Sequence, residues 1–434
     1  MAAIAFCIIG LATPRAALAH ATLLRSTPAA NSLLDKSPEV IRLVFSEQVV
    51  PSLSQIAVVC ARGDSVQLKI ANDPHDVHVL TGPVGAQLAG SCRVVWRVLS
   101  ADGHPVSGNF AFDVAGDVAI ASSTPVPAGE SMRNSASGVT APAAAEPEEK
   151  PIPIFASLFR GVGLGAFMAG VGILFFGVTA GERRALIPGA VVTTLIGVGT
   201  LLLMVHAIAW LEHASSTGLT GSFLSSMLGS TLGRVELLRI AFAALALWAI
   251  ALAKHRHIAL GLGIGCLIVS GAVGHPAALH PFLAIPAKIL HLLAGAAWLG
   301  GLLWLVWVAR HDEVAVRVEA QRVSSVALVS VILIVLSGLL QTALFLNTPS
   351  DLVRGDYGRL VLAKIVGLLI LVGFGAYNRF SLLPRLESGG ATQRLARSAK
   401  QEIAVVAIVI IIGGFLAYVP TPPIADASPT TTGT

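Results

Sequence analysis

The stretch SADGHPVSG, residues 100–108, decides how the first part of the chain folds. It follows the alternating run VVWRVL at 94–99 and precedes NFAFDV at 109–114, and alternation of this kind predicts β-strands. Glycine and proline in the stretch predict a turn between the two strands. Asp102 and His104 are therefore expected on a loop held by a rigid sheet, where a carboxylate and an imidazole two positions apart can face one ion. On its own, the pattern is more typical of a hairpin turn with a solvated histidine than of a metal site.

A third candidate ligand comes from the beginning of the chain. Residues 4–12 are almost wholly apolar and Ala17-Leu18-Ala19 is a small-x-small cleavage pattern, so residues 1–19 are predicted to be a signal peptide. Cleavage would make His20 the N-terminal residue, whose α-amine and ring Nδ1 can chelate one metal ion. With Asp102 and His104, this gives a nitrogen and oxygen ligand set that suits tetragonal Cu(II). The sequence therefore predicts a copper site at these three residues.

Four stretches of the exported part carry a family resemblance: HATLLRSTP at 20–28, VIRLVFSE at 40–47, WRV at 96–98 and SADGHPVSG at 100–108. Together they resemble the CopC family of periplasmic copper-binding proteins. The resemblance covers residues 20–116 and implies an all-β, Greek-key sandwich of cupredoxin-like fold that carries Cu(II) on His20, Asp102 and His104. Glu47 could orient a ligating histidine through a hydrogen bond, or could simply be exposed.

Two of the four cysteines, Cys60 and Cys92, lie in strand-like segments of this domain. An oxidising compartment allows them to form a disulfide. Two buried free thiols remain the alternative, because the sequence does not give the distance between the two Cα atoms. His75 and His78 lie in NDPHDVH at 72–78, where Asn, Asp and Pro predict a loop with solvated histidines.

The composition indicates that the rest of the chain lies in a membrane. Hydrophobic residues make up 54% of the chain and charged residues 12%, whereas soluble domains carry about 25% charged residues. The net charge of +5 does not indicate nucleic-acid binding, because the basic residues lie between long apolar runs. Residues 117–153 are rich in Ala, Pro and Ser and predict a flexible linker, which keeps the copper domain close to the apolar segments after it. Residues 421–434 are predicted to be a disordered tail.

Apolar segments long enough to cross about 30 Å of hydrocarbon predict an all-α membrane bundle over residues 154–420. We expect eight helices, near 154–180, 186–211, 233–253, 257–274, 283–309, 323–346, 358–379 and 400–419. The loops then assigned to the cytoplasm carry most of the Lys and Arg residues. The positive-inside rule therefore places the N-terminal domain and the C-terminal tail on the periplasmic side of a bacterial inner membrane.

Three histidines, His206, His275 and His291, are predicted near the outer ends of these helices. Ionisable residues at membrane depth are costly and usually functional, so the three form a candidate copper path. Histidines that only connect helices by hydrogen bonds are the alternative. Lys364 is expected at the outer face and Glu402 near the inner face of the membrane.

Several membrane segments also carry a resemblance, in the order GH at 274–275, HLLAGAAWLGG at 291–301, RVSSVA at 322–327, YGRLVLAK at 357–364 and YNR at 377–379. They resemble the CopD family, whose members are associated with copper uptake across the inner membrane. The resemblance spans most of residues 154–420 and implies a polytopic copper transporter in a fused CopC–CopD chain.

The sequence thus predicts a copper transporter, and not an enzyme, that acts in copper homeostasis or resistance. Its exported domain would pass Cu(II) to the membrane domain, where Cu(I) is a further candidate state, and copper chaperones are candidate partners. No G-x-x-x-x-G-K-[ST] stretch is present in the chain, so transport would use a gradient or tight binding of the arriving ion. A membrane b-type haem protein with paired histidines and copper sequestration with a helical anchor remain the alternatives.

Overall fold

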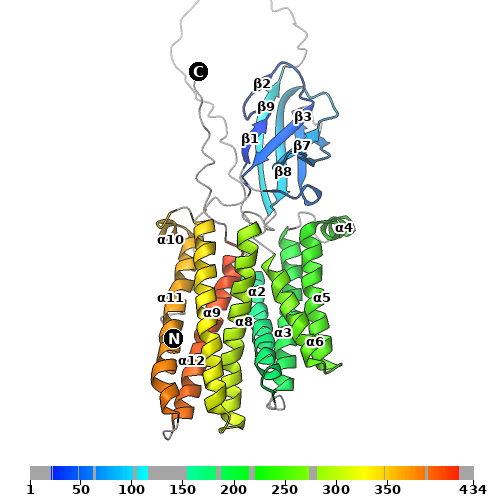
Figure 1. The fold of residues 1–434 in the computed structure, drawn as a ribbon. Coiled ribbons are helices and arrows are strands. Elements are labelled where there is room, and N and C mark those ends of the chain that lie inside the picture. Colours follow the sequence, from blue (N-terminus) through cyan, green and yellow to red (C-terminus); the bar gives the residue numbers. More distant parts are fainter. Residues whose placement is uncertain are drawn as a thin grey trace, which may run out of the picture. The chain divides into compact units, whose positions relative to one another are not determined.

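The computed structural model describes residues 21–115 and 154–419, apart from Thr22, Glu47 and residues 62–64, 101–104, 182–186, 215–219, 273–280, 347 and 387–389. These residues form a β domain and a helical domain, which are described in turn (Figure 1). The predicted signal peptide at 1–19, the linker at 117–153 and the tail at 421–434 lie outside the described residues.

The described strands of the β domain form two sheets. The first sheet contains, in spatial order, β1 (Leu23–Thr27), β3 (Val40–Phe45), β7 (Asp76–Pro83) and β6 (Ala71–Asp73). The second contains β2 (Leu33–Leu34), β9 (Pro105–Val114), β8 (Gly90–Leu99), β4 (Gln55–Cys60) and β5 (Ser65–Gln67). Neighbouring strands are antiparallel except β2 and β9, which run parallel.

The two sheets share one apolar core. Along β3, β4 and β8, buried and exposed residues alternate, as expected for strands with one face turned inward. Buried residues from both sheets form a single cluster, in which the Trp96 ring meets the Phe45 ring edge-on with centroids 5.3 Å apart. The prediction of an N-terminal all-β domain is confirmed.

A disulfide joins the neighbouring strands β4 and β8. Cys60 and Cys92 lie directly opposite each other in this antiparallel pair and are covalently bonded. The sequence left open whether these cysteines pair, and the strand register settles the question by bringing their Cα atoms to 4.0 Å.

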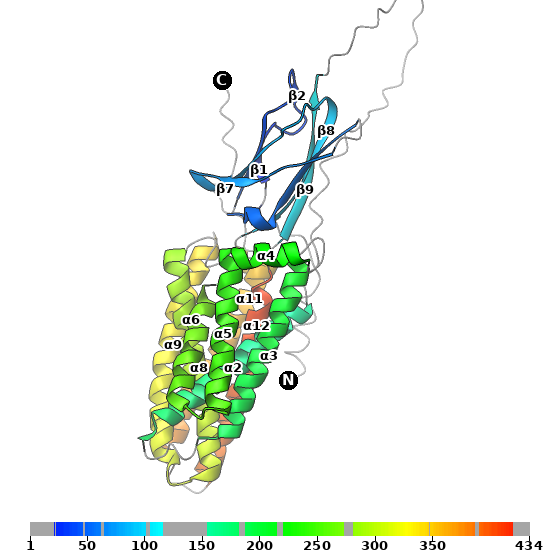
Figure 2. The same ribbon diagram turned by 90° about the vertical axis from the view of Figure 1, so that its right-hand side faces the viewer.

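The helical domain contains ten described α-helices (Figure 2). They are α2 (Ile154–Val178), α3 (Gly189–Ala214), α4 (Gly221–Gly229), α5 (Thr231–Ala251), α6 (Arg256–Gly271), α8 (Pro281–His311), α9 (Val316–Phe345), α10 (Asp351–Arg354), α11 (Asp356–Tyr377) and α12 (Ala391–Leu416). Helix α11 continues into a π-helical turn, Asn378–Leu382, and a 3₁₀ turn, Leu383–Arg385.

The expected number of eight membrane-spanning helices is not supported. All eight segments are helical, but among the described residues six helices are long and apolar enough to cross a membrane: α2, α3, α8, α9, α11 and α12. Helix α6 has 16 residues, or about 24 Å at 1.5 Å per residue, which is shorter than the hydrocarbon layer. Helix α5 carries three charged residues, Arg234, Glu236 and Arg239, in its first half. Apolar run length alone therefore overestimated the number of spans.

Glycines allow helices α2 and α8 to cross at a short distance. A methyl group on Gly300 of α8 would overlap the backbone of Gly172 on α2, and one on Gly172 would overlap the carbonyl oxygen of Ala296. The two helices therefore approach to backbone contact, as small residues allow in membrane bundles.

Candidate metal centre

The fold brings the start of β1 and the end of β8 to the same end of the β sandwich. Leu23 pairs with Phe45 in antiparallel register, so β1 begins beside the end of β3. Four residues later, Val49 forms a bridge with Ser100, which directly follows β8. Four residues reach at most about 14 Å, so these two chain ends lie close together. Ala21, the first described residue, is fully buried in the same core.

The loop that carries Asp102 and His104 connects the two longest strands. Strands β8 and β9 pair over ten residues each, up to Leu99 opposite Pro105, so both ends of the loop are fixed by the sheet. Gly108 lies opposite Trp96 in this pair, and a methyl group on Gly108 would lie 2.5 Å from the indole ring. The last glycine of the SADGHPVSG stretch therefore makes room for the aromatic ring.

The predicted copper ligands themselves lie outside the described residues. This applies to His20, Asp102 and His104, and also to Glu47. In the part of the chain that the structure does describe, no group of three or more His, Cys, Asp or Glu side chains could hold a metal ion. The ligand set of the β domain therefore stays a prediction.

His75 lies in the turn between β6 and β7, and His78 is the third residue of β7. The backbone N–H of His75 donates to Asp73 Oδ1 at 3.0 Å, and the backbone N–H of His78 donates to Asp76 Oδ1 at 2.9 Å. His78 Nδ1 also lies 2.9 Å from the same oxygen of Asp76. The hydrogen bond from the His78 backbone, followed by that from its ring, lowers the pKa of Asp76. These contacts close the turn. The loop predicted over 72–78 is instead a hairpin, in which residues 72–73 and 76–78 belong to paired strands.

His206 of α3 is a fully engaged imidazole inside the helical domain. It is 2% exposed, and its Nδ1 lies 3.2 Å from the carbonyl oxygen of Ala156 and 3.1 Å from the hydroxyl of Tyr418. Its Nε2 lies 3.5 Å from Arg160 Nη1. Because a carbonyl only accepts, Nδ1 carries the proton, and Nε2 accepts from the guanidinium. Neither nitrogen is left to bind copper or a haem iron in this arrangement.

His291 of α8 is held differently. Its Nδ1 lies 2.9 Å from the hydroxyl oxygen of Ser337 on α9. That hydroxyl donates its own proton to the carbonyl oxygen of Leu333 at 2.6 Å, so it accepts from His291 Nδ1–H. The ring also makes a hydrogen bond with the backbone of Ile334, so α9 holds it through two residues. A histidine whose Nδ1–H is fixed by a neighbouring group can present Nε2 to a metal ion.

Comparison with known proteins identifies both parts of the chain. Residues 23–115 match the CopC domain family and residues 317–416 match the family Copper resistance protein D. Copper resistance protein C of Escherichia coli is 34% identical over 106 residues, which cover 83% of that protein and 23% of this chain. The chain belongs to the CopC family, and residues 317–416 match the CopD family model.

Two further relatives extend this result. Copper transport protein CutJ of Bacillus subtilis is 26% identical over 438 residues, covering 94% of this chain and 76% of CutJ. The crystal structure of CopC from Methylosinus trichosporium OB3b is 31% identical and covers 22% of this chain and 94% of that one, with a TM-score of 0.21. The names of these relatives refer to copper transport and copper resistance.

His275 and two methionines of the helical domain are further residues there that could bind copper. His275 lies outside the described residues. Met204, two positions before His206, is 41% exposed, because two helix positions turn a side chain to the opposite face. Met168 is 4% exposed and packs beside Gly295. The methionines therefore do not gather around His206.

Glu402 lies deeper within its helix than the sequence suggested. It is the twelfth residue of α12, about 17 Å from the first residue of that helix, and is 2% exposed. The expectation assumed that the helix begins at residue 400, but it begins nine residues earlier, at Ala391, with a first turn that includes exposed Arg394. The Nζ of Lys364, which was expected at the outer face, lies beside Gly413, three residues before the end of α12.

Sequence reasoning missed a group of charged residues buried in the CopD part. Arg239 and Glu236 are 2% and 9% exposed, and their nearest charged atoms lie 2.5 Å apart, although not with the angles of a hydrogen bond. Arg160 contacts His206, as described above. The available signal was the position of Arg160, the one charged residue in the apolar run of α2.

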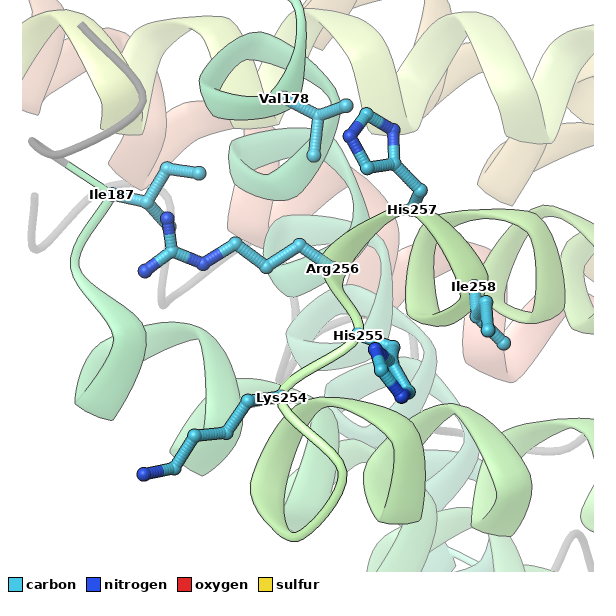
Figure 3. A pocket seen from close by; sticks show the side chains of 7 residues that line it. All are labelled: Val178, Ile187, Lys254, His255, Arg256, His257 and Ile258. Carbon is cyan, nitrogen blue, oxygen red and sulfur yellow. The ribbon is translucent and has the colours of Figure 1, made fainter.

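A hollow of about 250 Å³ lies where α5 turns into α6 and α2 into α3 (Figure 3). Its lining residues are Val178, Ile187, Lys254, His255, Arg256, His257 and Ile258. The His-x-His spacing resembles a metal site, but both imidazoles are exposed and point in different directions (Figure 3). The hollow shows that the α2–α3 and α5–α6 connections lie at the same end of the bundle.

Proposed function

We propose that this protein takes copper from outside the cell membrane and moves it into the cell. In this proposal, the mature N-terminal amine and ring of His20, together with Asp102 and His104, bind Cu(II) at the end of the β sandwich. The observation that carries the proposal is the convergence of the start of β1 and the β8–β9 connection at that end. Residues about 80 positions apart in the sequence thereby become neighbours.

The copper ion then passes to the helical domain, where His291 is the described residue best prepared to receive it. The Nδ1–H group of its ring is held by Ser337, which leaves Nε2 for Cu(I) or Cu(II). The CutJ relative, named a copper transport protein, covers both domains of the chain and supports a joint function of the two.

The orientation follows from the distribution of positive charge. The end of the bundle at which α2–α3 and α5–α6 connect carries Lys254 and Arg256, and the connection after α2 contains Arg183 and Arg184. The positive-inside rule assigns this end to the cytoplasm, and so assigns the β domain and the C-terminal tail to the periplasmic side of a bacterial inner membrane. Cytoplasmic copper chaperones are then the expected acceptors.

The capture step is tested by extending the mature N-terminus. An added glycine before His20 moves the α-amine away from the ring and should weaken Cu(II) binding by the purified full-length protein steeply, as measured by competition with a chelator. The control inserts the glycine in the linker, after residue 130. Equal affinity of the two extended proteins would exclude the amine as a ligand.

The transfer step is tested in cells by measuring cytoplasmic copper. His291→Ala should abolish copper accumulation that depends on the protein, because it removes the imidazole ring. His311→Ala is the matched control, since His311 lies on the same helix, is exposed and bonds the carbonyl oxygen of Trp307. Accumulation by His291→Ala equal to that of the control would remove this histidine from the copper path.

A further inference from the structure

Glu402 is a buried carboxylate in the middle of α12 that contacts two other elements. Its Oε1 accepts a hydrogen bond from Trp298 Nε1 of α8 at 2.8 Å. Its Oε2 accepts one from Asn378 Nδ2, in the π-helical turn after α11, at 2.9 Å. Both donors are neutral. In an apolar bundle, a carboxylate charge without a positive partner is destabilising, because the ion has lost its hydration and gained no counter-charge.

Glu319 provides an internal reference for this site. It is also 2% exposed and also accepts from an indole of α8, Trp304 Nε1, at 2.9 Å. Its second contact, however, is the guanidinium of Arg322 at 3.3 Å. The domain therefore contains two tryptophan–glutamate pairs, one with a positive partner and one without.

The charged and titratable groups on the elements around Glu402 are not paired with it. Helix α12 packs against α2, α8, α11 and the π-helical turn. These elements carry Arg160; Lys288, His291, Arg310 and His311; Asp356, Tyr357, Arg359, Lys364 and Tyr377; and Arg379. Arg160 contacts His206, Arg379 donates to Ser324 at 2.9 Å, and the Arg394, Arg397 and Lys400 side chains of α12 itself are exposed. Within the described residues, none of these groups forms an ion pair or hydrogen bond with Glu402.

Two buried polar atoms without a partner lie next to this carboxylate. Asn378 Oδ1 is buried and has no hydrogen-bond partner. A half-turn of the Asn378 amide would exchange Oδ1 with Nδ2, so that Oδ1 could accept a hydrogen bond from Oε2–H of a protonated Glu402. The site therefore offers partners to both the charged and the neutral form of the side chain.

Ser398 supplies the second such atom. Its hydroxyl is buried and unpartnered, and the residue is 5% exposed. It lies four positions before Glu402 on α12 and so on the same face, one turn closer to the beginning of the helix. A buried hydroxyl of this kind is a place where an ordered water can bind. The π-helical turn at Asn378 adds to this picture, because such turns are frequent at functional sites.

We propose that Glu402 is a proton-binding site of the membrane domain and that it releases its proton toward the start of α12 when copper enters the bundle. The O–H bond of the neutral acid breaks, the proton leaves by way of Ser398 to water, and the positive charge of the copper ion compensates the carboxylate that remains. The positive charge of copper thus replaces that of the proton beside the carboxylate. The coupling to copper rests on the proposed transport function, whereas proton binding by Glu402 does not.

The proton site is tested by infrared titration of the purified full-length protein in lipid nanodiscs. We expect a carboxylic-acid C=O band that disappears as the pH rises, that is lost in Glu402→Gln and that remains in Glu319→Gln. Trp298→Phe keeps the carboxyl group but removes one donor, so it should shift the frequency of the band. A band that is unchanged in Glu402→Gln and unshifted in Trp298→Phe would overturn the inference.

The coupling is tested in proteoliposomes that contain a pH-sensitive dye, with copper supplied together with ascorbate. As copper enters through protein molecules whose periplasmic side faces outward, the proton released toward the start of α12 should make the lumen more acidic. Glu402→Gln should lose this pH change, and Ser398→Ala should slow it. Copper entry without any pH change in the native protein would overturn the inference and leave transport standing. Absence of copper entry, with the infrared band still titrating, would overturn the proposed function and leave the proton site.

Discussion

The two domains bury polar side chains to very different extents. In the β domain, the buried polar side chains are two serines, Ser54 and Ser100, within the described residues. The described part of the helical domain buries many more, namely Ser157, Thr200, His206, Ser230, Glu236, Arg239, Ser270, Glu319, Ser330, Ser337, Ser398 and Glu402.

The difference follows from the solvent around each domain. A β sandwich in water can place its polar ligands on loops and keep its core apolar. A bundle in hydrocarbon has no water on its outer surface, so any group that handles an ion must lie inside and find its partners there. We therefore expect substitutions of polar residues to affect the stability of the bundle more than that of the sandwich.

The largest effect is expected from the buried pair on α5. Glu236→Ala leaves the Arg239 guanidinium buried without its counter-charge and should lower the free energy of unfolding by about 3–5 kcal/mol. Denaturant unfolding of the detergent-solubilised protein measures this loss. The double variant with Arg239→Ala should recover part of the loss, and a double variant as unstable as the single one would mean that the two charges are not coupled.

In the β domain, the largest effect should come from the cross-link and not from a charge. Replacing both Cys60 and Cys92 by serine should destabilise the sandwich by about 2–4 kcal/mol. Hydrogen exchange of the full chain should show faster exchange in β4 and β8 and no change in the helices. Cys266→Ala, which removes no cross-link, is the control. Equal exchange in β4 and β8 with and without the disulfide would contradict the prediction.

Gly108 connects the core of the sandwich to the loop that carries the predicted ligands. Gly108→Ala places a methyl group against the Trp96 ring and should cost about 1–3 kcal/mol, as overpacking does in other cores. The emission of Trp96 should shift, and Cu(II) affinity should fall because the flanking strands move. Ser107→Ala, one position earlier and facing away from the ring, should change neither. An unshifted Trp96 emission in Gly108→Ala would show that the strand pair tolerates the extra group.

The smallest effect is expected from a surface charge of the β domain. Hydrogen bonds from His78 lower the pKa of Asp76 below its ordinary value of 3.8, so folding favours the ionised carboxylate. This contribution to stability is complete above pH 3.8 and is lost as the pH falls through the lower folded-state pKa. Urea unfolding should show a slightly steeper loss of stability at acid pH in the native protein than in Asp76→Asn. Identical pH profiles of the two proteins would mean that the turn does not depend on this charge.

The amino-acid sequence alone indicates the two-part organisation, the strand pair around residues 100–108 and the presence of every long helix, because alternating and continuous apolar patterns report directly on burial. It also identified both families through ordered motifs. The number of membrane spans was overestimated for two reasons. Helix α5 carries charged residues, and helix α6 is shorter than the bilayer is thick.

Hydrogen bonds between polar residues that are distant in the sequence become visible in the folded structure alone. The contacts of His206 with residues 50 and 212 positions away, of His291 with Ser337 and of Glu402 with Trp298 depend on helix packing. The cysteine pairing depends likewise on strand register. A local sequence pattern indicates which residues are buried. It does not indicate which distant residues contact each other, because those contacts depend on how the helices and strands pack.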